Sequence, residues 1–246
     1  MPIRADHRLL TGRRAVAAAA LLPALALATG CGGGGGDSGK DKPGPVKASG
    51  AVSIAKLTSA LLTSSDLPHV QVLPAGSKQQ LLGEAQKADT AACQPVLDQW
   101  SSQPKHPRQT YTGAMVTDTT DKDKGAKEIS LTVIASYKPG DATAVLTELA
   151  ASVAACHGFG VVRGGVTTHF EVRPATTASG LGDQQVTYTI GDPAKGAAGQ
   201  VLVTVARAGD ATAAYETVRA DHKPATLRRT IPVKQVDKLR AAAKGD

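Results

Sequence analysis

The chain has 246 residues and a formal net charge of +7, and only 3% of its residues are aromatic. This length is sufficient for a domain with a substantial hydrophobic core. A nucleic-acid-binding surface combines clustered basic residues with aromatic platforms, and here the aromatic residues are scattered singly, so the composition argues against nucleic acid as a partner. A mildly basic balance instead favours loose contact with acidic lipid headgroups or anionic cell-wall polymers.

The first 30 residues have the layout of an export signal. Basic residues near the start precede an apolar stretch over residues 15–28, which is shorter than the roughly 20 apolar residues that span a bilayer. The small residues Ala28, Thr29 and Gly30 then precede Cys31, an arrangement that resembles the lipobox of bacterial lipoproteins. The resemblance implies cleavage before Cys31 and attachment of a diacylglycerol to its sulfur. The alternatives are an ordinary cleaved signal with an incidental cysteine, or a buried apolar helix.

Residues 31–50 have the composition of a flexible linker, because five glycines follow Cys31 and Asp, Ser, Lys and Pro are interspersed up to Gly50. A domain held beside a bilayer needs such slack, and two acyl chains supply the two hydrophobic signals that lasting membrane residence requires. We therefore expect a lipoprotein signal peptide over 1–30, a linker over 31–50 and one domain over 51–246. The expected location is the extracytoplasmic face of the cell membrane, and the export route stays open between the general secretory and twin-arginine pathways.

The first two elements of the domain follow from hydrophobic periodicity. An amphipathic helix is predicted in AVSIAKLTSALLTSSDLP, which ends at Pro68, and its inward residues are Ile54, Leu57, Leu61 and Leu62. The stretch EISLTVIASY, residues 128–137, alternates apolar and polar residues and predicts a half-buried strand. A second helix follows, with Asp141 as its expected N-cap and Cys156 on its buried stripe.

The second half of the chain adds strands and one more helix. Strands are predicted at THFEVR, QQVTYTIG and QVLVTVARAG, the last of them central because it is apolar on both sides. The pentapeptide GDATA leads into a helix at Gly140, whereas at Gly209 it predicts a turn between strands. A C-terminal amphipathic helix is expected to point Val233, Val236 and Leu239 inward and Lys234, Lys238 and Lys244 outward. This order indicates the α+β class, a single domain with an antiparallel sheet flanked by helices.

The chain carries no strong catalytic or metal-binding motif. Its histidines lack the spacing of a zinc site. The glycine-rich segment GFGVVRGG follows a predicted helix and leads into a strand, whereas a phosphate-binding loop follows a strand and leads into a helix. The carboxylates of DTTDKDKGAKE miss the EF-hand spacing, so a solvated hairpin loop is favoured over a calcium site. His169, Glu171 and Arg173 share one strand face, where an exposed polar surface is favoured over a proton-transfer pair. These patterns predict no catalytic residue, no metal, no cofactor and no enzymatic activity.

Two cysteines remain besides Cys31. Outside the cytoplasm an even pair indicates a disulfide, and the apolar patterns around Cys93 and Cys156 bring both residues to the core. The alternative makes Cys156 a nucleophile activated by His157. It is the weaker reading, because neighbouring residues on a helix point about 100° apart.

Four segments together allow a family comparison: a helix at LTSALLTSSDLP, a cysteine in DTAACQPVL, a helix ending in cysteine at LAASVAACHGF, and the final VLVTVARAGDATAAYETV. This series resembles the PknH-like extracellular sensor domains of actinobacteria. The resemblance implies an antiparallel sheet flanked by helices, a cleft that receives an extracellular ligand, and no catalysis by the domain itself. Those domains carry two disulfides where this chain can form one, and kinase motifs are absent from the sequence.

The predicted function is that of a ligand-binding or sensor-like module at the outer face of the cytoplasmic membrane. Its partners would be the membrane, through the acyl anchor at Cys31, and an extracellular small molecule or envelope protein. The alternatives are a cell-envelope assembly or interaction protein and a hydrolase of unrecognised family. A concave apolar pocket with converging polar groups would favour the first function, a flat exposed apolar patch the second, and a nucleophile beside a base in a cleft the third.

Overall fold

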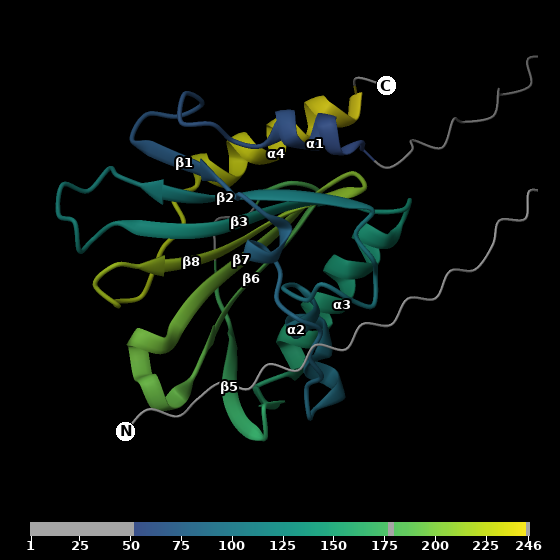
Figure 1. The fold of residues 1–246 in the computed structure, drawn as a ribbon, viewed down its shortest axis with the longest axis vertical. Coiled ribbons are helices and arrows are strands. Elements are labelled where there is room, and N and C mark those ends of the chain that lie inside the picture. The colour runs from purple at the N-terminus through teal and green to yellow at the C-terminus, as the bar shows by residue number, and fades with distance from the viewer. Residues whose placement is uncertain (1–51, 177–179, 245–246) are drawn as a thin grey trace, which may run out of the picture. The chain divides into compact units, whose positions relative to one another are not determined.

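The computed structural model describes residues 52–176 and 180–244. Eight antiparallel strands form one sheet in the order β1-β2-β3-β8-β7-β6-β5-β4, and helices flank it (Figure 1). The α+β prediction is therefore confirmed. The predicted signal peptide, Cys31 and the linker lie outside the described residues. The strands are β1 (Val70–Pro74), β2 (Thr110–Asp118), β3 (Glu128–Ser136), β4 (Gly158–Arg163), β5 (Val166–Pro174), β6 (Gln184–Gly191), β7 (Gln200–Ala208) and β8 (Ala211–Arg219).

Helices cover parts of both faces of the sheet. The α-helices are α1 (Ile54–Ala60), α2 (Gln94–Asp98), α3 (Asp141–Ala155) and α4 (Thr230–Lys244), and the 3-10 helices are η1 (Lys78–Gln80), η2 (Ala91–Cys93) and η3 (Pro193–Gly199). Figure 1 shows α1 and α4 side by side at one side of the sheet and α2 and α3 at another.

Alternation along the strands separates the two larger hydrophobic cores, and a smaller cluster gathers Leu81, Leu82 and Val133. On β8, Tyr215 packs in the core beneath α1 and α4, whereas its neighbour Ala214 packs in the core beneath α3. Successive strand residues point to opposite faces, so we call these the α4 face and the α3 face. The core residues that the structure describes all follow position 51. A chain that begins at residue 32 therefore retains all of these residues.

The two GDATA segments fold differently, as predicted. The copy at Gly140 begins α3, whereas the copy at Gly209 makes the turn between β7 and β8, where Gly209 has a φ of 60°. β7 pairs with both β6 and β8 and is therefore an interior strand, which explains its apolar residues on both sides. The N-cap of α3 is Gly140 and not Asp141, which is the first residue of the helix.

The half-buried prediction for β3 is wrong. Its polar residues Ser130, Thr132 and Ser136 are buried on the α4 face, beneath α1 and α4. Hydrogen bonds stabilise two of these buried hydroxyls, since those of Ser130 and Thr217 pair at 2.8 Å and Ser136 Oγ donates to the Val52 carbonyl at 3.1 Å. Thr132 Oγ1 has no hydrogen-bond partner among the described residues. The serine and threonine side chains of β3 therefore did not indicate a solvent-exposed face of the strand.

The helix predicted up to Pro68 is shorter, because α1 ends at Ala60 and Leu61 is extended. Leu57, Leu61 and Leu62 are buried, but Ile54 is 45% exposed and does not belong to the inward stripe.

In α4, Val236 and Leu239 are buried and Val233 is partly buried, as predicted, but Lys238 does not point freely outward. Its Nζ lies 2.7 Å from Asp66 Oδ2 and links α4 to the segment after α1.

The segment GFGVVRGG is a strand and a turn. Its first six residues form β4, and Gly164 and Gly165, with φ of 57° and 80°, make the hairpin turn into β5. The two adjacent positive φ values require glycine, which accounts for the pattern without a phosphate.

Candidate functional site

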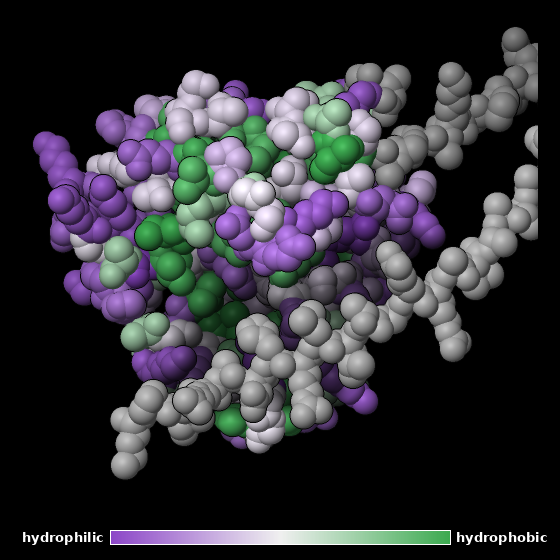
Figure 2. Space-filling view, in the orientation of Figure 1, coloured by the Kyte–Doolittle hydropathy of each residue, from purple (hydrophilic) through white to green (hydrophobic). Residues whose placement is uncertain are grey.

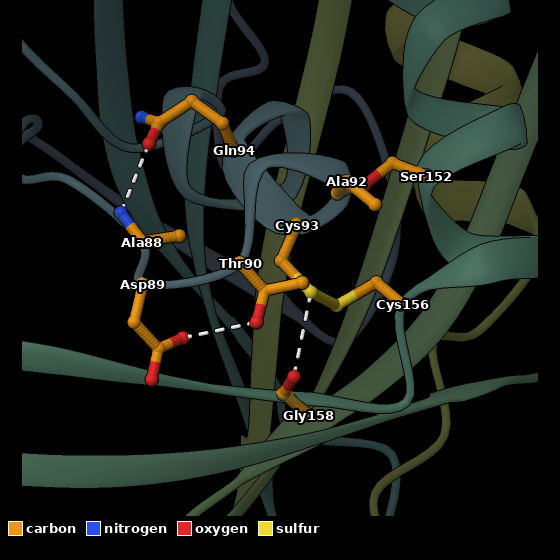
Figure 3. The surroundings of a disulfide bond; sticks show 9 residues. All are labelled: Ala88, Asp89, Thr90, Ala92, Cys93, Gln94, Ser152, Cys156 and Gly158. Atoms are coloured by element: carbon orange, nitrogen blue, oxygen red, sulfur yellow. Dashed lines mark hydrogen bonds between the residues drawn. A yellow bond between two sulfur atoms is a disulfide. The ribbon is translucent and has the colours of Figure 1, made fainter.

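The disulfide predicted between Cys93 and Cys156 is present, with the two Cα atoms 5.1 Å apart (Figure 3). Both cysteines are buried, Cys93 at the end of η2 and Cys156 at the C-cap of α3. Ser152 Oγ donates to the Ala92 carbonyl beside the bridge and adds a second tie between these segments (Figure 3). The nucleophile reading of Cys156 does not hold, because a sulfur in a disulfide has no thiolate to offer.

The acidic loop between β2 and β3 does not form a cation site. Asp118 pairs with Arg228 at 3.0 Å, and Glu128 accepts hydrogen bonds from Thr226. The carboxylates of Asp121 and Asp123 each accept a hydrogen bond from the backbone N–H two residues later in the sequence, which is typical of aspartates in turns. Within residues 52–176 and 180–244, no three His, Cys, Asp or Glu side chains converge as metal ligands.

The row of polar residues on β5 lies on the surface. His169, Glu171 and Arg173 are exposed, and Glu171 Oε2 pairs with Arg173 Nη2 at 2.8 Å. Between them, Val172 is buried on the α3 face. The structure therefore agrees with the exposed polar surface that the sequence favoured for these three residues.

A further ionic cluster, which sequence reasoning missed, joins the loop before β2 to α3. Lys105 Nζ and His106 Nε2 lie 2.7 and 3.2 Å from Glu148 Oε1. The Lys105 hydrogen bond and the adjacent His106 lower the pKa of Glu148, while burial opposes them. The adjoining cavity measures about 20 Å³, which is room for a single water and not for a substrate. We interpret this cluster as structural.

The most suitable ligand site is a pocket of about 410 Å³ on the α4 face, beside the start of α4. Its floor is the sheet, where β6 and β7 place Thr189 directly opposite Leu202. Its walls are Ala175, Thr176 and Leu181, which lie between β5 and β6, and residues of the connection from β8 to α4. The lining residues comprise six apolar side chains, four threonines and one arginine: Ala175, Leu181, Leu202, Ala225, Leu227, Pro232, Thr176, Thr189, Thr204, Thr226 and Arg229.

The wall after β8 is fixed by the β2–β3 hairpin. Glu128 Oε1 accepts from Thr226 N and Oγ1 at 2.6 and 2.7 Å. The guanidinium of Arg228 pairs with Asp118 and donates to Thr120 Oγ1 and the Pro68 carbonyl. Two of the loop carboxylates that could suggest calcium therefore hold a wall of the pocket.

The polar groups of the pocket are placed by strand alternation. Thr187 and Thr189 point to the α4 face, while Tyr188 between them is buried in the α3-face core. On β7, Thr204 takes the same direction as Leu202. The signal in the sequence was the threonine alternation of QQVTYTIG, which predicts a strand and gives no hint of the concave wall above it.

Comparisons with known proteins identify the fold. The extracellular domain of PknH from Mycobacterium tuberculosis matches with a TM-score of 0.52 and 12% sequence identity, over 80% of this chain and 98% of that chain. A Mycobacterium smegmatis protein matches over 78% of this chain and 96% of its own at 18% identity, but its TM-score of 0.31 supports no argument. No family model matches the chain, and no curated protein matches it.

The fold defines this protein as an α+β domain similar in fold to the PknH extracellular domain. At this identity the similarity concerns the fold alone. Among the described helices, none has the length and hydrophobicity to cross a membrane.

Proposed function

We propose that the chain is an extracytoplasmic, lipid-anchored module that binds a small amphipathic molecule and performs no catalysis itself. The observation that carries the proposal is the pocket of about 410 Å³ beside α4. Ligand pockets typically measure about 300–1,000 Å³, and their walls are mainly apolar with a few polar groups that set orientation.

The lining indicates the chemistry of the ligand. Leu181, Leu202 and Leu227 offer contacts to an apolar body. The threonine hydroxyls both donate and accept hydrogen bonds, and the guanidinium of Arg229 adds a positive charge at the exposed side of the pocket. A molecule with an apolar body and an uncharged or anionic head group that accepts hydrogen bonds fits this lining.

The proposed location rests on separate features. The disulfide Cys93–Cys156 suits an oxidising compartment, and one structural neighbour, the PknH domain, is an extracellular domain by description. The proposed arrangement is a signal peptide over residues 1–30, acylation of Cys31, a linker up to residue 50, and the binding domain over 51–246. A flexible linker would let the domain reorient at the membrane surface, so that the pocket could reach molecules there.

The experiment is native mass spectrometry of the protein purified gently from the cells that produce it. We expect a noncovalent adduct whose mass exceeds that of the acylated chain. Extraction with organic solvent should release it as a small amphipathic molecule. Protein that carries no such adduct and binds none from a lipid extract of the same cells would refute the proposed function.

A further inference from the structure

A second unusual site lies on the α3 face and centres on Glu216. This residue is in the middle of the sheet on β8, directly between Leu131 of β3 and Val203 of β7. The residue is partly buried, and among the described residues its carboxyl group makes no hydrogen bond and no ion pair. Buried carboxylates are normally paired, because an unpaired buried charge is costly. Burial accordingly raises the pKa of Glu216 to about 7.

Two other buried polar groups lie near this site. Burial raises the pKa of the Tyr188 hydroxyl, and the charge of Glu216 raises it further. Trp100 Nε1 faces this hydroxyl and opposes both effects as a hydrogen-bond donor, although the contact misses strict hydrogen-bond geometry. The two groups therefore serve each other, and Glu216 is the unpaired group of this cluster.

An apolar strip runs from Glu216 to the edge of the sheet. The strand register places Leu131, Met115 and Leu73 in one row beside Glu216 on the same face. Leu73 is 72% exposed and Met115 41%, and Val218, two residues along β8, is 39% exposed. Adjacent strands lie about 4.8 Å apart, so the row from Glu216 to Leu73 extends roughly 14 Å. We call Leu73, Met115, Leu131 and Val218 the apolar strip.

The helices of this face leave Leu73, Met115 and Val218 exposed, whereas Leu131 is partly buried against the cluster of Leu81, Leu82 and Val133. α3 packs over β5, β6 and β7, and Leu81, next to η1, packs over Gly113 of β2. Figure 2 shows hydrophobic residues gathered left of centre, over the ends of β2, β3 and β8 seen at the left of Figure 1. Exposed apolar surface that adjoins an unpaired carboxylate is the reverse of an ordinary solvated sheet face.

We propose that Glu216 and the apolar strip bind an amphipathic amine, with its ammonium group on the Glu216 carboxylate and its apolar chain along the strip. The ammonium supplies the donors and the positive charge that Glu216 lacks. Glu216 repels an amphipathic molecule with an anionic head group. This site therefore selects a cationic head group, whereas the pocket beside α4 accepts an uncharged or anionic one. This site lies on the other face of the sheet from the pocket beside α4 and does not depend on it.

The test uses the chain from residue 32, which lacks Cys31 and therefore the acyl anchor, and needs no detergent. Dodecylamine, dodecanol and dodecanoate are titrated below their aggregation concentrations at pH 8, with fluorescence of Trp100, the only tryptophan, as the signal. We expect dodecylamine to bind about tenfold more tightly than dodecanol and dodecanoate to bind weakest. Glu216→Gln should remove the preference for the amine, whereas Glu171→Gln, on the exposed side of β5, should leave it unchanged.

A second variant separates the strip from the charge. Met115→Gln should weaken dodecylamine and dodecanol equally, because it alters only the apolar part of the site. Equal binding of amine and alcohol by the unaltered domain, or a preference that survives Glu216→Gln, would overturn the proposal. So would a concentration-dependent dimer in sedimentation that Met115→Glu abolishes, because the strip would then be an interface between copies of the chain.

Discussion

Gln235 of α4 holds the end of α1 through Leu62: its Oε1 accepts from the Leu62 backbone N–H at 3.0 Å, and its Nε2 donates to the Ala60 carbonyl at 2.7 Å. Gln235 is fully buried. The amide replaces the helical hydrogen bonds that α1 would have made had it continued toward Pro68. One side chain therefore both ends α1 and joins it to α4.

Gln235→Ala should destabilise the domain by about 2–4 kcal/mol, because it leaves a buried N–H and a buried C=O unpaired and opens a cavity. Urea denaturation of the chain from residue 32 measures this. Gln71→Ala, at an exposed position of β1, is the matched control and should change the free energy of unfolding by less than about 0.5 kcal/mol. Equal losses for the two variants would show that the amide bridge has no special role.

Loss of the disulfide should lower stability substantially. The cysteines are 63 positions apart in sequence, and a loop of this size corresponds to about 4 kcal/mol on the loop-entropy model. We expect the variant with both Cys93→Ala and Cys156→Ala to melt well below the unaltered domain. A reductant should lower the melting temperature of the unaltered domain and leave that of the variant unchanged. Two free thiols in denatured, unreduced protein that lacks residue 31 would contradict this account.

Stability should depend on pH through Glu216. Its pKa is about 7 in the folded chain against an ordinary 4.5. As pH rises, the carboxyl group therefore loses its proton in the unfolded chain before it does so in the folded chain. The free energy of unfolding should fall progressively between pH 4.5 and 7 as a result. Leu131 and Val203 flank the carboxyl group. Tyr188, the titratable group that senses its charge, stays neutral here because burial raises its pKa.

Glu216→Gln removes this penalty. Relative to the unaltered domain, the variant should gain up to about 3 kcal/mol at pH 8 and little at pH 4. Denaturation of both proteins across this range gives the difference, in which the other carboxylates cancel. Asp66, for example, is subject to burial that raises its pKa, yet hydrogen bonds from Lys238 and Thr63 outweigh burial and hold it at about 2 in both proteins. A difference that does not vary with pH would contradict the unpaired state of Glu216.

The anchor prediction concerns Cys31, which follows small residues and precedes the glycines. We expect the mature protein to fractionate with membranes in detergent-free buffer and to carry a lipid-sized mass increment. Cys31→Ala should leave unprocessed precursor or a mislocalised protein. Cys93→Ala serves as a control for loss of a cysteine elsewhere and should not alter acylation. A soluble unaltered protein without added mass would rule out the anchor.

The sequence predicted those elements whose signals are local. Alternation predicts β3, the apolar residues on both sides of QVLVTVARAG predict β7 as a central strand, and the GDATA segment at Gly209 predicts the β7–β8 turn. It did not predict the burial of Ser130, because the helices that cover this residue lie far away in the chain. Nor did it predict the pocket: Thr189 meets Leu202 only through the β6–β7 register, and Thr226 is fixed by Glu128, 98 positions away. Such contacts depend on tertiary pairing and have no local signature.

The central claim is that the pocket beside α4 holds a small amphipathic molecule, and the most direct test fills that pocket. Thr189→Trp places an indole over the floor, at a partly exposed strand position that tolerates aromatic residues. Thr117→Trp is the matched control, because Thr117 is also a partly exposed strand threonine but lies on the α3 face. The measurement is the amount of small molecule bound per chain after purification from the producing cells. We predict that the unaltered protein and Thr117→Trp retain it and that Thr189→Trp loses it; equal occupancy in all three would contradict the account.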